Sequence, residues 1–376
     1  ECLVLLGIFL GFWFFRGKVN YVRKPSEFAA NRVVRSVLVG IVALSLIVLM
    51  IYLFARGGLV QHLTSLGRGR FSELSGDGPV MLLIDLGAIA LYLWVAARPN
   101  DVRAPRFILA LAAVLVAQFV SNGSRSGALV VPLTVGLIWA LRRQRVPWRI
   151  GLLLLPLFFV SIGLMNAIRT SSWEGRTASE AAAGTGWSES FAIAQKEIAW
   201  RQSMSAQVPI VERGFDVTGG PLLGRSYIAA FVAFVPRPLW KDKPRGPGSL
   251  YAQLFLGLPK GGMSIPVNPT TELYWNFGAI GAFAFALLYG VLLRLAYHFY
   301  WRRYPSPVVV VFYALFITTF RFSTDFLVAF QQQLALLLFC AATIAIVDPG
   351  KRGLVVGPRG KSVGLGPRPP TADIRA

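Results

Sequence analysis

The polar residues of this chain that could do chemistry gather in four short segments, each beside an apolar run. In the first, SNGSRSG at 121–127, Arg125 stands in a turn between Gly123 and Gly127. Glycines let backbone amides approach an anion closely, and the arginine adds a planar fork of hydrogen-bond donors. The turn therefore predicts an anion site, and the alternative is an ordinary outer turn whose arginine meets lipid headgroups.

The second segment is VPRPLWKDKPRGPG at 235–248, in which four basic residues surround one acid. Its prolines restrict the backbone to extended and turn conformations. A rigid chain with an array of cations suits a phosphate or diphosphate, while a basic belt that grips anionic lipid is the alternative. The charged residues are Arg237, Lys241, Asp242, Lys243 and Arg245.

The third segment, TELYWNFG at 271–278, places Glu272 close to Tyr274 and Trp275 at the start of an apolar run. Aromatic rings at a membrane boundary usually form an interfacial belt, but they also offer flat faces to sugar rings. A carboxyl group in low-dielectric surroundings holds its proton more readily. Glu272 is therefore a candidate general acid or base, and an acid that stabilises a helix N-terminus is a fair alternative.

The fourth segment, TTFRFSTDF at 318–326, carries Arg321 and Asp325 four residues apart, a spacing that also suits a simple ion pair. Arg169 follows another apolar run on the same predicted side. Asp85 lies inside an apolar run, where an ionisable group is costly and is by default a functional candidate.

Other catalytic centres have no sequence pattern to support them. His62 stands alone in a loop, and His298 falls on the opposite predicted face. The sequence has no HExxH motif, no cysteine cluster, no compact acid triad and no GxSxG turn. We therefore predict neither a bound metal nor a cofactor. Cys2 and Cys340 lie in apolar runs and are expected to pack as small hydrophobic side chains.

The composition places these segments in a membrane protein. Of the 376 residues, 55% are hydrophobic and 15% are charged, against about 25% charged in a typical soluble domain. Nine apolar runs approach the ~20 residues that a transmembrane helix needs. They are 2–15, 36–54, 80–97, 107–121, 127–141, 150–167, 278–297, 307–322 and 327–347. We predict an all-α polytopic membrane protein with about nine visible transmembrane helices and an incomplete N-terminus, since the chain begins at Glu1.

The net charge of +21 gives an orientation rather than a nucleic-acid partner. Five segments hold 22 of the 38 basic residues but only 4 of the 17 acidic ones. They fall on one side if nine spans alternate, which is the positive-inside pattern of cytoplasmic loops. These segments are 16–35, 98–106, 142–149, 294–303 and 348–376.

The same alternation divides the chain into four parts. Residues 1–167 form an N-terminal transmembrane bundle of six spans, and 278–347 form a C-terminal bundle of three. Between them, 168–277 is a large outer loop. Within it, 220–236 is expected to be an interfacial or re-entrant helix, because a tenth span would break the charge pattern. Residues 348–376, rich in Gly, Pro and basic residues, are expected to be a disordered cytoplasmic tail.

Three stretches of the chain resemble the bacterial oligosaccharide repeat unit polymerases, the O-antigen polymerase (Wzy-type) group. They are Gly224-Arg225-Ser226-Tyr227, then Pro236-Arg237, Trp240 and Lys243-Pro244, then Glu272-Leu273-Tyr274-Trp275-Asn276-Phe277-Gly278. The turn at 123–125 matches the same group. The resemblance covers residues 120–340, and the large loop ahead of the last spans agrees with it.

The resemblance implies a glycosyltransferase of the bacterial cytoplasmic membrane whose active site faces the outside. Its donor and acceptor would both be polyprenyl-diphosphate-linked oligosaccharides, and its product would be a surface polysaccharide (O-antigen, capsule or exopolysaccharide). An acceptor hydroxyl attacks the anomeric carbon of the donor, and polyprenyl diphosphate leaves. Besides the lipid bilayer, a chain-length regulator protein would be a partner.

The polar segments can be given roles in such a reaction. Negative charge develops on the leaving diphosphate, and fixed cations stabilise it. We assign that role to Arg125, Arg237 and Arg321, and we choose Glu272 as the group that accepts or orients the acceptor proton. Asp325 and then Asp242 follow as the base. The expected substrate-binding residues are Arg169, Arg225, Lys241, Asp242, Lys243, Tyr274, Trp275 and Asp325.

Two rival functions stay open. An O-antigen ligase-like enzyme would share the donor but use another acceptor, and a histidine would be expected near the motifs. A transporter or flippase of lipid-linked sugars would need polar residues at mid-membrane depth and broken helices in paired repeats. Asp85 is the main residue of that kind in the sequence.

Overall fold

A computed structural model gives the fold of the chain. It describes residues 2–14, 32–59, 61–62, 65, 77–122, 125–143, 188, 191–192, 195, 207–232, 235, 239–240, 243–244, 246–258, 264–265, 267–303, 306–319 and 324–347. Within these residues all regular secondary structure is helical, which confirms the all-α class.

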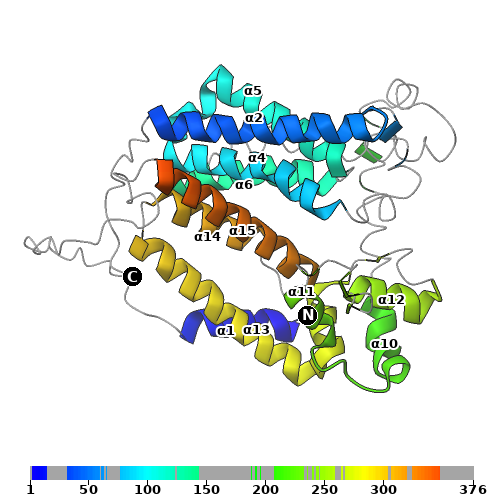
Figure 1. Cartoon of the computed structure of the whole chain (residues 1–376). Coiled ribbons are helices and arrows are strands. Elements are labelled where there is room, and N and C mark those ends of the chain that lie inside the picture. The colour runs from blue at the N-terminus through cyan, green and yellow to red at the C-terminus, as the bar shows by residue number, and fades with distance from the viewer. Residues whose placement is uncertain are drawn as a thin grey trace, which may run out of the picture.

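The helices are named as in Figure 1. They are α1 (Cys2–Phe14), α2 (Arg32–Ala55), α4 (Gly78–Ala97), the 3₁₀ helix η1 (Pro99–Arg103), α5 (Pro105–Asn122), α6 (Arg125–Arg143), α10 (Gln207–Thr218), α11 (Arg225–Phe231), α12 (Pro247–Leu256), α13 (Pro269–Arg303), α14 (Pro307–Thr319) and α15 (Thr324–Val347). Eight of the nine predicted apolar runs coincide with helices, and the other, 150–167, lies outside the described residues.

Four of the described helices are long and apolar enough to cross a membrane. These are Val33–Ala55, Gly78–Ala97, Pro269–Arg303 and Phe330–Val347. Three further apolar helices, α1, α5 and α14, are shorter. The chain therefore has the apolar helices of a multi-pass membrane protein, with four such spans in its described part against the nine that the sequence predicts.

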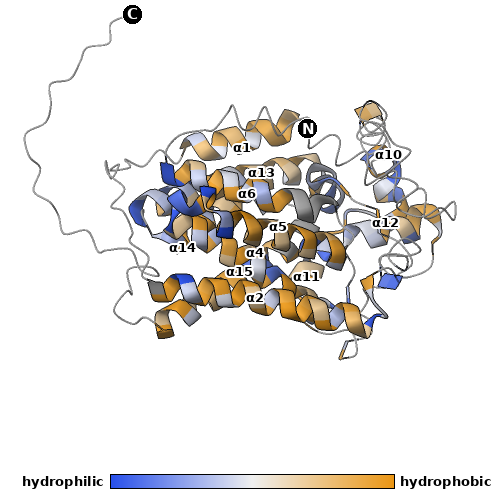
Figure 2. Cartoon of the chain, turned by 90° about the horizontal axis from the view of Figure 1, so that it is seen from above, coloured by the Kyte–Doolittle hydropathy of each residue, from blue (hydrophilic) through white to orange (hydrophobic). Residues whose placement is uncertain are grey.

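Helix α4 is the centre of the main bundle. It packs against α2, α5, α6, α14 and α15 (Figure 1), and every residue from Leu86 to Ala97 is buried. A helix that is apolar on all sides can be enclosed in this way without burying an unpaired polar side chain. Figure 2 shows the apolar residues along the middle of the bundle and the polar ones mainly towards its two ends.

Helices α1 and α13 form a second, closely packed pair. A Cβ atom on Gly11 would lie 2.0 Å from the Leu287 carbonyl oxygen, and one on Gly290 would lie 2.1 Å from the Ile8 carbonyl oxygen. Only glycine allows backbones to approach this closely. Near the start of α1, Val4 packs with Ala282 and Ala286. Phe12 meets Tyr297 further along, so the two helices run parallel.

The ends of several helices bring basic segments together. The Tyr300 hydroxyl donates a hydrogen bond to the Leu141 carbonyl at 3.3 Å, which joins the end of α13 to the end of α6. Arg302, Arg303, Arg142 and Arg143 follow there, and η1 packs against α6 at the same end. Described parts of three predicted cytoplasmic segments thus meet at one end of the bundle, which is called the basic end below.

Substitution of Gly11 by Leu should separate α1 from α13, because the new side chain meets the backbone of Leu287. Overpacking of this kind typically costs about 1–3 kcal/mol. We expect a lower unfolding midpoint in detergent, measured by the loss of monodisperse protein on heating. Gly40→Leu is the matched control, because nothing lies within 4 Å of a Cβ at that position in α2. Equal midpoints for the two variants would contradict this account of the helix pair.

Candidate functional site

Helix α13 is interrupted at Gly278, and this break shapes the site. Gly278 has φ 68° and ψ −173°, a conformation that is essentially open to glycine alone. The carbonyl groups just before the break accept hydrogen bonds from outside the helix. The Trp275 carbonyl accepts the backbone N–H of Leu222 at 3.0 Å, and the Asn276 carbonyl accepts that of Leu223 at 2.9 Å. The backbone of 222–223 therefore satisfies the end of the short helical segment that begins at Pro269.

The loop that supplies these N–H groups shortens the predicted interfacial helix. Gly219, Gly220, Leu223 and Gly224 all have positive φ, so the chain between α10 and α11 cannot be helical. Helix α11 consequently begins at Arg225 and ends at Phe231. The prediction of a helix over 220–236 is wrong for its first five residues, because the left-handed residues that turn the chain towards α13 lie there. It is also wrong for Val232 and Val235, which lie beyond the end of α11.

A buried polar cluster joins α11 to α13, and we call Ser226, Glu272 and Asn276 the Ser226 cluster. The Ser226 hydroxyl donates to Glu272 Oε1 at 2.7 Å. Asn276 Nδ2 donates to Ser226 Oγ at 2.8 Å and to the Glu272 carbonyl at 2.8 Å. The Gly224 N–H donates to Asn276 Oδ1 at 3.0 Å. Two segments 46 residues apart in sequence are thus fixed to each other.

Helical spacing explains why this cluster can form. Glu272 and Asn276 are four residues apart and lie on one face of α13, towards the start of α11. The side chains of Ser226, Glu272 and Asn276 are at most 1% exposed. Buried polar groups contribute to stability only when they are hydrogen-bonded, and the four bonds above meet that requirement.

Aromatic residues next in sequence to the cluster stack on one another. Tyr227 stacks on Phe277 with ring centroids 6.1 Å apart, and Phe277 stacks on Phe285 at 4.3 Å. Burial, with a smaller contribution from the Glu272 carboxylate, raises the pKa of the Tyr227 phenol above its ordinary value. Tyr227 therefore stays protonated and neutral at physiological pH.

Trp275 belongs to a protein core and not to a sugar-binding surface. Its ring is fully buried among Ile210, Leu222, Tyr251 and Val267. This corrects the expectation that Trp275 lines the substrate site, since no face of the ring is left to stack on a sugar. The physical reason is that α10 and α12 cover this side of α13.

Some of the remaining predicted site residues are described with their side chains, some by their backbone alone, and some lie outside the described residues. Tyr274 is half-buried and stacks on Phe215 at 5.2 Å. Arg225 is exposed at the start of α11, and Lys243 Nζ donates to the Val235 carbonyl at 2.9 Å. The backbones of Arg125 and Asp325 lie at the starts of α6 and α15. Outside the described residues lie Arg169, Arg237, Lys241, Asp242 and Arg321.

Helix α11 also packs against α15. In Figure 1 it lies beside the first turns of α15, where the backbone of Asp325 is. The third and fourth polar segments of the sequence therefore approach each other through α11. The structure brings together residues 224–227, 272–278 and the start of α15 at the end of the bundle opposite the basic end.

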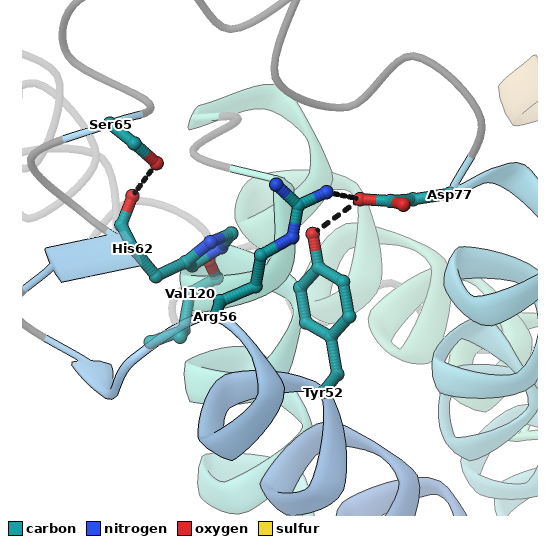
Figure 3. A network of polar contacts seen from close by, with 6 residues as sticks. All are labelled: Tyr52, Arg56, His62, Ser65, Asp77 and Val120. Atoms are coloured by element: carbon teal, nitrogen blue, oxygen red, sulfur yellow. Dashed lines mark hydrogen bonds and ion pairs between the residues drawn. The ribbon is translucent and has the colours of Figure 1, made fainter.

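The sequence analysis missed a second polar cluster, which Figure 3 shows. The Tyr52 hydroxyl donates to Asp77 Oδ2 at 2.8 Å, and Arg56 forms an ion pair with the same carboxylate. His62 is 2% exposed and lies against Tyr52, so the description of His62 as a lone loop residue is wrong. Arg56 and Asp77 both adjoin apolar runs, which is the one sequence feature that could have suggested their pairing.

Asp85 is paired inside the bundle. Gln118 Nε2 donates to Asp85 Oδ1 at 2.6 Å, which joins α4 to α5. In the described part of the chain, no group of three or more His, Cys, Asp or Glu side chains could hold a metal ion. Comparison of the chain with protein-family models, curated proteins and solved structures finds no match. The function is therefore argued from the residues and their geometry.

Replacement of Asn276 by Ala should destabilise the start of α13. The half-buried Gly224 N–H loses its acceptor, and the buried Ser226 hydroxyl loses the Asn276 donor. The loss of a buried hydrogen bond costs about 1–3 kcal/mol. Thermal unfolding in detergent measures the effect. Asn100→Ala, at an exposed position of η1, is the matched control and should unfold like the wild-type protein. A stable Asn276→Ala variant would remove the cluster from the forces that hold α11.

Substitution of Gly278 by Ala should disrupt the same region by a different route. A side chain disfavours the observed φ and ψ, by about 1–3 kcal/mol, and a continuous helix would withdraw the carbonyls that Leu222 and Leu223 contact. Limited proteolysis of the loop between α10 and α11 should become faster. Gly136→Ala in α6, where a Cβ meets nothing within 4 Å, should not change the rate. Identical digestion of both variants would argue against a structural role for the break.

Proposed function

We propose that this protein is a membrane glycosyltransferase that polymerises polyprenyl-diphosphate-linked oligosaccharide repeat units into a surface polysaccharide. The observation that carries the proposal is the Ser226 cluster. It joins two of the three sequence stretches, 224–227 and 272–278, that carry the resemblance to oligosaccharide repeat unit polymerases. If the two stretches form one functional site, this explains why the sequence carries both motifs.

The proposed orientation places the Ser226 cluster at the outer face of a bacterial cytoplasmic membrane. An α-helix rises about 1.5 Å per residue, so Gly278 to Arg303 spans about 37 Å. That length exceeds the ~30 Å hydrocarbon core, so the cluster and the basic end can lie on opposite sides. Basic residues favour the cytoplasmic side, which leaves the cluster facing outwards. A chain-length regulator protein would then act from the same side.

The proposed reaction transfers a glycan between two lipid-linked molecules. An acceptor hydroxyl oxygen forms the new bond to the anomeric carbon of the donor, and the bond from that carbon to the diphosphate oxygen breaks. The hydroxyl proton passes to a carboxylate, and polyprenyl diphosphate leaves with its negative charge. Arg125, Arg237 and Arg321 would stabilise this charge, with Arg225, Lys241 and Lys243 as further cations.

Glu272 remains the proposed base, and its burial sets what this role requires. Its carboxylate is fully buried and accepts the Ser226 hydroxyl, so the acceptor sugar must reach it past α11. Asp325, whose backbone starts α15 near α11, is the next choice. Glu272→Gln separates a chemical role from a structural one, because the glutamine oxygen can still accept from Ser226 while it cannot accept a proton as a base.

In a purified-protein assay with lipid-linked repeat units, the wild type should make a ladder of glycan products. Arg125→Lys and Arg237→Lys should reduce product by about 10²–10³-fold, because lysine cannot provide the planar fork of donors. Glu272→Gln should reduce it by about 10²–10⁴-fold without a change in unfolding midpoint.

The matched controls are Arg213→Lys and Glu212→Gln, both exposed in α10 of the same outer region, and both should keep wild-type activity. Normal ladders from Arg125→Lys and Arg237→Lys would remove these arginines from the mechanism. A normal ladder from Glu272→Gln would limit Glu272 to holding α11.

A transporter of lipid-linked sugars is a second candidate, and one observation favours it. The break at Gly278 makes α13 a discontinuous helix, as in many transporter binding sites. Against it, Asp85 is paired with Gln118 within the bundle, and the break lies at one end of the span. In vesicles, movement of the labelled lipid without new glycosidic bonds would support the transporter, and a ladder would support the polymerase.

A further inference from the structure

The second polar cluster ties together the ends of three helices. We call Tyr52, Arg56, His62 and Asp77 the brace (Figure 3). Tyr52 and Arg56 lie at the end of α2, and Asp77 immediately precedes α4. Since α5 starts beside η1 at the basic end, its last turn lies at the opposite end, and His62 reaches it there.

His62 caps the end of α5. Its Nε2 lies 3.1 Å from the Val120 carbonyl oxygen, and that carbonyl belongs to the last turn of α5. The last four carbonyls of an α-helix have no partner within the helix, and a histidine side chain is one of the groups that can supply one. The carbonyl is an acceptor, so the contact requires the tautomer with its proton on Nε2.

His62 is itself held at its ring and at its backbone. Its ring meets the Tyr52 ring edge-to-face, with centroids 5.2 Å apart. The Ser65 hydroxyl donates to the His62 carbonyl at 2.8 Å. Tyr52 is in turn fixed by Asp77, which also binds Arg56. The position of the Val120 carbonyl is therefore set by contacts that reach across 58 residues of sequence.

The capped turn leads directly to Arg125. Helix α5 ends at Asn122 and α6 begins at Arg125, so two residues connect them. With so short a connection, the end of α5 determines where the backbone of Arg125 lies. We propose that His62 is a positioning residue for Arg125, which the sequence predicts to bind an anion. This inference rests on the proposed function, in which Arg125 contacts the diphosphate of the lipid-linked donor.

The test compares His62→Ala with His62→Gln in the full-length protein. Alanine removes the donor to Val120, whereas the glutamine amide can restore it. A misplacement of about 1 Å can lower a rate by about 10²-fold, so His62→Ala should lose about 10- to 100-fold in polymerisation kcat/KM. His62→Gln should stay within about 3-fold of the wild type, because it retains the hydrogen bond. His298→Ala, at the other histidine, should keep the wild-type rate.

A second readout does not depend on enzyme activity. A cysteine at Asn122, in a protein whose Cys2 and Cys340 are replaced by Ser, reports the exposure of the turn to a soluble maleimide. His62→Ala should change its labelling rate at least about 3-fold, and His62→Gln should not, because the cap is restored. Ser65→Ala, which loosens His62 without removing the ring, should shift labelling in the same direction and serves if His62→Ala does not fold.

The outcomes are distinct. Wild-type labelling in both His62→Ala and Ser65→Ala overturns the inference, whatever the activity. Equal loss of activity in His62→Ala and His62→Gln with unchanged labelling also overturns it, since the imidazole would then act chemically. If the wild-type protein makes no polymer but His62→Ala still alters the labelling rate, the positioning role of the brace stands. Only the proposed function is then refuted.

Discussion

The interruption of α13 at Gly278 is the constraint on which the end of the molecule opposite the basic end depends. A continuous helix would bond the carbonyls of Trp275 and Asn276 to its own next turn. The break instead offers them to Leu222 and Leu223, and the chain that donates to them leads into α11. Gly224, in the left-handed region, precedes α11 and turns the chain so that Ser226 faces Glu272. One backbone irregularity thus positions a buried carboxylate beside a second segment.

Around the contact between α11 and α13, the molecule combines close backbone packing with hydrogen bonds between side chains. Gly7, Gly11 and Gly290 bring α1 against α13, which stiffens the long helix below the break. At the ends of α2, α4 and α5, the brace performs a similar task with side-chain hydrogen bonds. In the proposed reaction, the cations stabilise a negative charge that develops only in the transition state. Such a site needs side chains that are held rigidly in place, and these contacts provide that support.

The sequence predicted the features that depend on local pattern. Apolar runs identified eight helices, because hydropathy and length are properties of each segment by itself. The position of Trp275 was not predictable in this way, since its burial depends on α10 and α12 packing over that face. His62 was missed for a related reason, because its partner Val120 is 58 residues away. Leu223 has positive φ, which nothing in its residue type indicates, and the predicted interfacial helix was too long as a result.

The central claim is that a lipid-linked diphosphate sugar binds where α11 meets α13. A donor analogue with a photoreactive group beside its diphosphate, added to the protein in vesicles, tests this directly when the cross-linked peptides are identified by mass spectrometry. We predict adducts within 220–231 and 269–278 that an excess of unlabelled donor removes. Adducts confined to the basic end, around Arg142 and Arg303, or adducts that the unlabelled donor does not reduce, would contradict the account.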